Sequence, residues 1–460
     1  MPFDPARAAI RFGCGLSPSV AAPETPGAML ALLAGPDKAA AAFPAPGFEG
    51  VRKVHVAVVA ARRRIRDAET QEARDAAARE RAALVRDLRS EAAGWFRQTV
   101  LRRVTTEDGL RERLVAFWAD HFTARGKGGP QRFGQAGYVE DAIRPHVAGR
   151  FADMLKAAAT HPLMLLYLDQ TGSVGPNSAI VTKRGRELGL NENLAREMLE
   201  LHTLGVEGPY GQADVWQLAQ VLTGLGYQRE KGFVFRAKYA EPGPLAFMGR
   251  DYGSEAPSLN RVMDALEDLA AHPATATHLA RKLAVHFCGD TPDAGMVAAM
   301  AEAYRAQDGQ LMPVYAAMLE HPAAWSEGAG NVKQPMDFVT SALRALDITP
   351  RHLPAKPRAI MRHIVNPMTL MGQTWGAPPG PDGWPEADAA WITPQRMAAR
   401  LQWGMSVPFR MMRLLPDPRE FVETALGPEA PEAVRFAARA AETRAEGIGL
   451  VLASPAFQRF

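Results

Sequence analysis

Residues 52–104 place the strongest constraint on the fold, because this stretch is dominated by Arg, Glu and Ala and has almost no Pro or Gly. Ala, Arg and Glu are strong helix formers. A single helix of this length would reach about 80 Å at 1.5 Å per residue, so we predict a bend or split near Gly94. We expect the charged first half to be a solvated helix that projects from the body, and a partner-binding arm is the alternative.

The rest of the chain is predicted to be mainly α-helical, because apolar residues recur at helical spacing and Gly or Pro marks the breaks. The exceptions are a small β-ribbon at about 233–249, with strands 233–239 and 245–248 around a Glu-Pro-Gly-Pro turn, and a Pro/Gly loop over 372–385. Helices are expected at 107–122, 138–158, 162–169, 192–204, 212–224, 259–271, 273–287, 293–307, 311–320, 334–346, 394–403 and 430–454. This pattern divides the chain into an irregular or helical N-terminal segment (1–50), a long charged helix or helix pair (51–104) and a helical main body (105–460).

Composition excludes several classes of protein. The 460 residues carry a net charge of only +3 and no long basic block, so nucleic-acid binding is not predicted. Arg makes up most of the basic residues; this suits carboxylate or phosphate recognition, although a GC-rich genome is the simpler explanation. Cys14 and Cys288 are too few for a disulfide framework or a Cys-rich zinc site. With no signal peptide and no long apolar run, we expect a cytoplasmic protein without a membrane span, and export together with a partner is the alternative.

The common catalytic motifs are missing from the sequence. It contains no G-x-x-x-x-G-K-[ST], no G-x-G-x-x-G after a strand, no H-E-x-x-H and no C-x-x-C. Ser173 lies in Gly-Ser-Val-Gly, which is not the nucleophile elbow of the α/β-hydrolases. Nucleotide-dependent, zinc-peptidase and α/β-hydrolase functions therefore lose their usual support.

The helix predicted at 192–204 carries the densest set of polar residues. Asn191 can cap its first turn, and Gly205 suits the left-handed residue that follows its end. His202 falls within the apolar arc of the helix, whereas Arg196 can pair with Glu192 and Glu200 at spacings of four. An inward His beside carboxylates predicts a general base or a ligand, and a core His with a surface Glu/Arg ladder is the alternative.

A second predicted helix carries a stripe of proton-exchanging side chains. His278, Lys282 and His286 are four residues apart and share one face, beside an apolar face of Leu279, Leu283 and Phe287. Such a stripe can bind an anion or assist acid–base chemistry, and a wet helix face is the alternative.

Carboxylate and imidazole residues recur at helix ends, as in Asp120-His121 after Trp118 and in His161 and Asp169, which bracket another helix. Gln170 and Asn177 follow in the next loop. These groups could converge in a bundle core as metal ligands. Because the sequence has no E-x-x-H pair, we do not predict a metal site.

Four of the eight Trp lie close together, and Asp382 precedes one of them in Pro-Asp-Gly-Trp384. The four are Trp375, Trp384, Trp391 and Trp403. A loop Trp more often anchors the loop by packing, and stacking on a sugar is the alternative.

These stretches together resemble an uncharacterised bacterial family, catalogued as domain of unknown function 1800, in order along nearly the whole chain. The resemblance is carried by Arg11-Phe12-Gly13, Phe117-Trp-Ala-Asp-His-Phe122, His161-Pro-Leu-Met-Leu-Leu-Tyr-Leu-Asp169, Asn191-Glu-Asn-Leu-Ala-Arg-Glu-Met-Leu-Glu-Leu201, His272-Pro-Ala-Thr-Ala276, Arg281-Lys-Leu283, Lys333-Gln-Pro335 and Pro381-Asp-Gly-Trp-Pro385.

The resemblance implies a largely helical fold and no particular reaction or cofactor. Members are often encoded beside a second uncharacterised family that resembles alkaline-phosphatase-like proteins, which implies a co-encoded partner of that kind. This chain departs from the family at the β-ribbon turn, where many relatives resemble His-Asp-x-Gly-x-Lys. Here the stretch is Ala240-Glu-Pro-Gly-Pro-Leu245, so any mechanism that needs that His and Lys is in doubt for this protein.

The leading hypothesis is an enzyme with a polar, helix-lined pocket that performs hydrolytic or other acid–base chemistry. A non-catalytic assembly or export partner and a glycan binder that uses Trp384 are the alternatives. The candidate catalytic residues are Glu192, Glu197, His121, His202, Asp169, Lys282 and His286. The candidate substrate-binding residues are Asn191, Asn193, Arg196, Asn177, Asp382 and Trp384.

Overall fold

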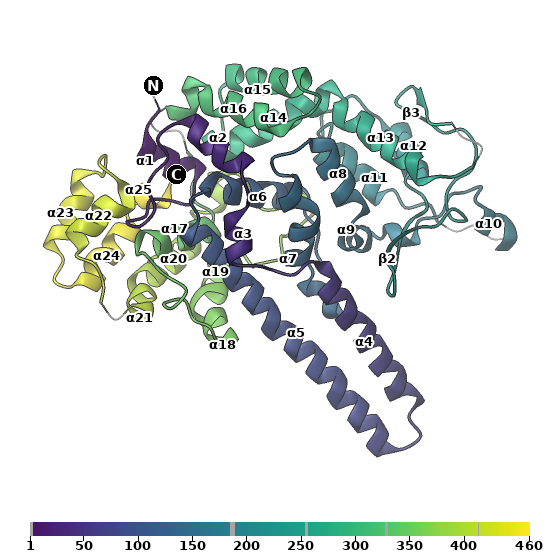
Figure 1. The fold of residues 1–460 in the computed structure, drawn as a ribbon, viewed down its shortest axis with the longest axis horizontal. Helices are drawn as coiled ribbons and strands as arrows, with labels where there is room; N and C mark the ends of the chain where they lie inside the picture. The colour runs from purple at the N-terminus through teal and green to yellow at the C-terminus, as the bar shows by residue number, and fades with distance from the viewer. Residues whose placement is uncertain (1–2, 185–188, 254–255, 327–329, 413) are drawn as a thin grey trace.

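Helices cover most of the chain that the structure describes, which confirms the mainly α-helical fold. The computed structural model describes residues 3–184, 189–253, 256–326, 330–412 and 414–460. They form a broad helical body from which one long pair of helices projects (Figure 1). No helix in these ranges is long and apolar enough to cross a membrane.

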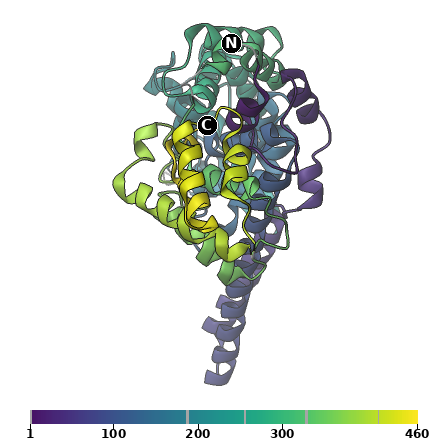
Figure 2. The ribbon, with the colours of Figure 1, turned by 90° about the vertical axis from the view of Figure 1, so that its left-hand side faces the viewer.

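The projection is a hairpin of α4 (Phe48–Asp67) and α5 (Gln71–Thr105), which stands clear of the body in both views (Figures 1 and 2). On α4 the buried or half-buried residues Val51, Val54, Val58 and Ala61 alternate at spacings of three and four. Such spacing keeps one seam turned toward the partner helix. A narrow apolar seam therefore holds together two helices whose other faces are charged and solvated.

The split in this region lies at Ala68–Thr70, so the prediction of a break near Gly94 is wrong. Thr70 ends the turn, because its side chain accepts the backbone N–H of Ala73 and caps α5. Gly94 lies inside α5, next to Ala93 and near Phe96, which are buried against the body. A glycine inside a helix costs only about 1 kcal/mol, which this burial offsets.

The N-terminal half of the body surrounds the buried helix α6. Its elements are α1 (Pro5–Arg7), η1 (Ala8–Phe12), α2 (Pro26–Ala34), α3 (Lys38–Ala42), α6 (Gly109–His121), η2 (Gly129–Phe133), α7 (Gln135–Tyr138), η3 (Val139–Ile143), η4 (Arg144–His146), α8 (Phe151–Thr160), α9 (Pro162–Tyr167), η5 (Gln170–Gly172), α10 (Ala179–Arg184), α11 (Asn193–Glu197), η6 (Met198–His202) and α12 (Gln212–Val221). The predicted helix 192–204 is thus an α-turn followed by a π-helical turn, and Gly205 does adopt a left-handed φ of 86°.

The C-terminal half is also helical. Its elements are α13 (Leu259–Ala271), α14 (Pro273–Cys288), α15 (Ala294–Ala306), α16 (Leu311–Glu320), η7 (Pro322–Trp325), α17 (Pro335–Ala345), α18 (Pro357–Ile360), η8 (Met361–Val365), α19 (Asn366–Leu370), η9 (Asp388–Ala390), α20 (Pro394–Ser406), α21 (Pro408–Met411), α22 (Pro418–Leu426), α23 (Glu432–Ala440), α24 (Arg444–Ala453) and α25 (Pro455–Gln458). The predicted loop 372–385 connects α19 to η9.

Strands are present where the ribbon was expected, but they pair differently. β2 (Gly232–Phe235) pairs with β1 (Leu225–Gln228), and β3 (Ala246–Phe247) pairs with β4 (Arg250–Asp251), both antiparallel. The predicted pairing across the Pro/Gly turn is therefore wrong. Glu241 explains the difference, because its backbone N–H donates to Thr223 and its carboxylate accepts from Asn177. The turn is tied to a neighbouring loop and cannot close a hairpin.

Two hydrophobic cores meet in the middle of the body. One contains α6, α8, α9 and α12–α16, with Trp118 and Leu114 fully buried. The other contains the end of α5 together with α17, α20, α22 and α24, with Phe338 and Trp403 buried. Helices α5 and α6 follow each other directly and belong to different cores, so the seam between the cores runs beside them. The division of the chain into three segments stays a prediction.

Candidate functional site

The stripe of His278, Lys282 and His286 on α14 faces inward, toward the boundary between the two hydrophobic cores. His286 is buried, and its Nδ1 lies 3.1 Å from both carboxylate oxygens of Glu386. His278 directs its Nε2 to the carbonyl of Leu201 at 3.0 Å. Lys282 lies between them and interacts electrostatically with Asp120, Glu386 and Asp382. The three residues of the stripe therefore face polar partners on α6, η6 and the loop 380–386.

Asp120 anchors that loop to the end of α6. The backbone N–H of Trp384 donates to both carboxylate oxygens of Asp120, at 2.9 and 3.1 Å. Gly383 allows this approach, because its φ is 83° and a Cβ there would lie 2.6 Å from each Asp120 oxygen. The motif Pro-Asp-Gly-Trp thus needs its glycine for both backbone conformation and space.

The surroundings of Asp120, Lys282 and Glu386 shift their pKa values in different directions. Burial and the nearby Glu386 raise the pKa of Asp120 to about 8. Burial also lowers the pKa of Lys282, although the three carboxylates around it oppose the shift. For Glu386, burial alone would raise the pKa, but His286 and Lys282 overcome it and the pKa is lowered. Asp120 therefore holds a proton at neutral pH while Glu386 is ionised.

His121 and His202 lie deeper, behind Lys282. Their ring centroids are 5.9 Å apart, and Nε2 of His121 lies 3.1 Å from the carbonyl of His202. Burial lowers the pKa of His202 to about 3 and lowers that of His121 as well, so both are neutral. They are uncharged polar groups in the core, and neither lines the pocket described below.

The structure separates the other sequence candidates from this cluster. Glu192 and Arg196 form a partly exposed network with Glu200 and Gln212. This is the surface ladder that was the alternative for this helix. Glu197 is half-buried and faces the loop, because Asp382 is among the charges that raise its pKa after burial and Glu200.

Asp169 and the asparagines have local structural roles. Asp169 adopts a left-handed φ of 57°, which directs its exposed carboxylate to Lys127 at 2.5 Å. Asn191 donates to the carbonyl of Leu168 and accepts the N–H of Asn193, which closes the entrance of α11. Asn177 binds Glu241. None of these residues lines the pocket.

The four tryptophans between residues 375 and 403 mainly pack. Trp391 and Trp403 are buried, and their indole N–H groups donate to backbone carbonyls of Pro385 and His363. Trp384 lies against Trp391 with ring centroids 6.2 Å apart, and Trp375 packs on Phe96. Only Trp375 and Trp384 of these four keep partly exposed rings. The glycan-binding alternative stays untested.

A pocket of about 160 Å³ opens beside the cluster at the seam between the two cores. His286, Asp120 and Trp384 line it. The lining also includes the charged residues Arg102, Arg103, Arg144, Glu112, Glu140 and Asp337. Pockets at such junctions are common ligand sites.

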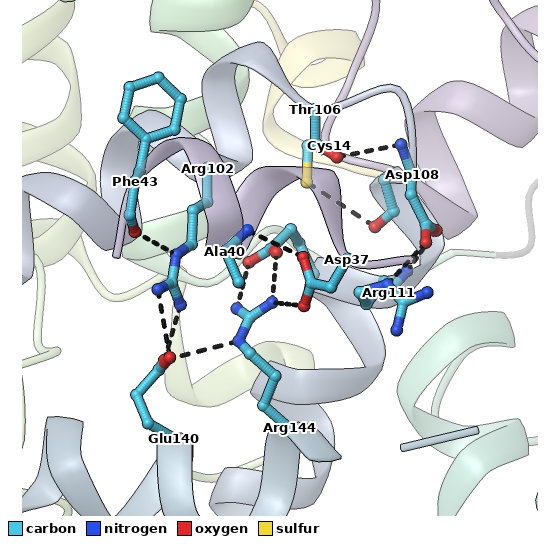
Figure 3. A network of polar contacts seen from close by, with 12 residues as sticks. Cys14, Asp37, Ala40, Phe43, Arg102, Thr106, Asp108, Arg111, Glu140 and Arg144 are labelled. Carbon is cyan, nitrogen blue, oxygen red and sulfur yellow. Dashed lines mark hydrogen bonds and ion pairs between the residues drawn. The ribbon is translucent and has the colours of Figure 1, made fainter. Parts of the chain in front are cut away.

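The charges in this lining are paired: Figure 3 shows the contacts around Arg102, Glu140 and Arg144, and Arg103 pairs with Asp337. Arg144 donates to both oxygens of Glu112, at 2.8 and 2.9 Å, and to Asp37 at 2.8 Å. Arg102 forms a bidentate pair with Glu140 at 2.6 and 3.1 Å. Each buried charge thus has an opposite partner, and the lining is polar without being strongly positive or negative.

Sequence reasoning missed the roles of Asp120 and Glu386. Asp120 was noted only as the neighbour of His121, and Glu386 lies two residues after Trp384 in a loop without periodicity. The available signal was the loop itself, because Pro-Asp-Gly-Trp-Pro-Glu combines a rigid turn with two carboxylates. No trio of His, Cys, Asp and Glu among the described residues is arranged to hold a metal ion.

Fold and site together define a helical protein with a polar pocket between two cores. The chain matches the family described as protein of unknown function (DUF1800) over residues 7–459, and it belongs to that family. Neither the curated proteins nor the solved structures contain a match to the chain.

Proposed function

We propose that this protein is an enzyme whose pocket performs general acid–base chemistry, most simply the hydrolysis of a small substrate. One observation carries the proposal. His286 is held by Glu386 through Nδ1, while its buried Nε2 has no hydrogen-bond partner among the described residues. The same side chain lines the pocket.

The hydrogen bond to Glu386 selects the tautomer of His286. An ionised carboxylate can only accept, so Nδ1 donates to Glu386, and in the corresponding neutral tautomer the lone pair is on Nε2. A neutral imidazole oriented by a carboxylate is the usual arrangement of a general base. We assign Nε2 of His286, whose side chain lines the pocket, as the atom that takes a proton from the attacking water.

Asp120 supplies the complementary acid. It lines the same pocket, and burial beside Glu386 raises its pKa to about 8. A carboxyl group that keeps its proton at neutral pH can act as the acid beside a base in the same pocket. As water attacks the substrate, His286 takes the proton of the water and Asp120 gives its own proton to the leaving group. Solvent then returns the proton from His286 to Asp120.

Lys282 positions this pair electrostatically. It lies near Asp120, Glu386 and Asp382 and reduces the repulsion among the three carboxylates. Without it, the pKa of Asp120 would rise further, because Lys282 is one of the groups that hold it down.

A paired-variant assay tests the proposal. The purified chain is given p-nitrophenyl esters and phosphates and a metabolite extract, and His286→Gln and Asp120→Asn are compared with it. His146→Gln is the matched control, because His146 is half-buried and lies outside the pocket. We expect a substrate whose turnover falls roughly 100-fold or more in His286→Gln and is unchanged in the control. Equal turnover by the wild type and His286→Gln would refute the proposal.

Partner binding is a second candidate function, and the hairpin favours it. The half of the hairpin around Thr70 stands away from the body and is almost wholly exposed (Figure 2). An alkaline-phosphatase-like protein encoded beside the gene is the proposed partner. Pull-down from the native host with the full chain, and with residues 62–86 replaced by a short turn, tests it. Loss of a co-purifying protein only with the short hairpin supports this function, and recovery of no partner by either chain counts against it.

A further inference from the structure

A second and larger hollow lies against the outside of the pocket. Its volume is about 610 Å³, and it is bounded by α5, the segment 125–136 and the segment 361–377. It shares Gln135, Ala136, Trp375 and Gly376 with the pocket that holds Asp120 and His286. The two spaces therefore meet at the same four residues, and we define the larger one as the outer groove.

The outer groove is lined by cations and by no acidic residue among those the structure describes. The cations are Arg89, Arg125, Lys127 and Arg132. Lys127 is paired with Asp169. Within the described ranges, Arg89, Arg125 and Arg132 form no ion pair with a carboxylate, and this differs from Arg102, Arg103 and Arg144 in the inner pocket. Three guanidinium groups without a carboxylate partner thus line the outer groove.

Aromatic rings accompany these charges. Tyr167, Phe133 and Trp375 line the groove. The guanidinium of Arg125 lies 6.0 Å from the ring centre of Tyr167, and that of Arg132 lies 5.3 Å from the ring centre of Phe133. Arg125 also donates to the carbonyl of Pro378 at 2.8 Å, which fixes it at the loop. The groove therefore offers flat aromatic surfaces next to guanidinium groups that can bind an anion.

We infer that the outer groove binds the anionic end of the substrate: a small organic molecule with a phosphate or carboxylate group attached to a planar or apolar part. Its volume lies within the ~300–1,000 Å³ typical of small-molecule sites. The oxyanion would lie among Arg89, Arg125 and Arg132 and the planar part along Trp375, which places the rest of the molecule toward Asp120 and His286. This inference rests on the proposed function only in identifying the ligand as the substrate.

Calorimetric titration with small probes tests the inference. Phenyl phosphate and benzoate represent the two kinds of anion, inorganic phosphate lacks the ring, and benzyl alcohol lacks the charge. We expect at least one aromatic anion to bind tenfold or more tightly than both benzyl alcohol and inorganic phosphate. Failure of both aromatic anions to bind, or equal binding of benzyl alcohol or inorganic phosphate, would overturn the inference.

Two double variants locate the site. Arg89→Gln/Arg132→Gln removes two exposed groove cations, and Arg79→Gln/Arg81→Gln removes the same charge from the exposed part of α5 outside the groove. We expect the first to weaken binding of the aromatic anion tenfold or more and the second less than twofold. An equal loss in both would show a nonspecific charge effect and overturn the inference.

The binding measurement is independent of catalysis. His286→Gln should bind the aromatic anion within twofold of the wild type, because His286 does not line the outer groove. Undiminished turnover by His286→Gln refutes the acid–base proposal even where the groove binds the probe. Failure of the groove to bind either aromatic anion leaves the acid–base proposal standing.

Discussion

The hairpin and the polar network of the inner pocket are built from the same residue types at opposite extremes of exposure. On the hairpin, Arg64 pairs with Glu80 at 2.7 Å, and the two side chains are 56% and 46% exposed. In the network, Arg144 pairs with Glu112 at 2.8 Å, and the side chains are 7% and 2% exposed. The two pairs have nearly equal distances but differ in burial, and Arg144 also makes a second bond to Glu112 and one to Asp37.

This contrast shows that the distance between two charges does not by itself give the contribution of an ion pair to stability. An exposed pair contributes about 0–1 kcal/mol, because water solvates either charge when the partner is lost. A buried charge that loses its partner has no such compensation, and its isolation costs about 3–5 kcal/mol. The network therefore fixes α3, α6 and η3 together as a unit, whereas the hairpin tolerates changes in its charges.

The largest expected effect is that of Glu112→Gln. This change removes the bidentate partner of Arg144, which still donates to Asp37, so we expect the free energy of unfolding to fall by about 3 kcal/mol, the lower end of the range for a buried charge that loses its partner. Urea denaturation measures it. A loss below about 1 kcal/mol, the range of an exposed pair, would show that the buried pair behaves like the one on the hairpin.

Gly383→Ala should have the next largest effect. A Cβ at this position meets both oxygens of Asp120 at 2.6 Å in a residue with φ of 83°, so we expect a loss of about 2–3 kcal/mol from clash and strain together. Gly249→Ala is the control, because its φ is 74° and nothing lies near its Cβ. Equal thermal destabilisation of the two variants would mean that the contact with Asp120 adds nothing.

Asp120→Asn should change how stability depends on pH. The pKa of Asp120 is about 8 in the folded chain against 3.8 for an ordinary aspartate. The native state therefore keeps a proton that the unfolded chain releases, and stability contributed by this group falls as pH rises from about 4 to about 8. The Asp120→Asn variant lacks this decrease of stability with rising pH. We expect its stability relative to the wild type to improve by about 2 kcal/mol between pH 5 and pH 8, a value discounted for partial solvent access.

Unfolding free energies at the two pH values check this prediction. Asp382→Asn is the matched control, because Asp382 is exposed in the same loop. An unchanged pH slope in Asp120→Asn would show that Asp120 is ionised in the native state at neutral pH.

Glu80→Gln should have the smallest effect. It removes the partner of Arg64 on the hairpin by the same chemical change as Glu112→Gln, and we expect less than about 0.5 kcal/mol. Thermal unfolding in low and high salt measures it. A loss comparable with that of Glu112→Gln would remove the contrast between the two regions.

The sequence predicted the elements whose signals are local. The helix 259–271 begins and ends where expected, since Ser258 caps its first turn and His272-Pro273 starts the next helix. The structure adds that the His272 ring itself accepts the N–H of Ala274. The inward stripe on α14 was also visible, because spacing of four places polar and apolar residues on separate faces.

The remaining features depend on partners that are distant in sequence. Nothing near Glu386 indicates that His286, 100 residues away, will be its partner. Arg196 and Glu192 satisfied the spacing rule equally well as site residues and as a surface ladder, and only their exposure in the folded chain separates the two. Gly94 was misjudged because its effect depends on the body against which α5 packs.

Helix α5 is continuous from the capped turn at Thr70 to the buried Arg102 and Arg103. One stiff rod of 35 residues therefore carries the tip of the hairpin, Arg89 of the outer groove and one wall of the inner pocket. A force applied sideways at the tip would act on that wall as torque about a fulcrum where the rod enters the body. The projection is mechanically a lever whose short arm ends at the pocket that His286 also lines.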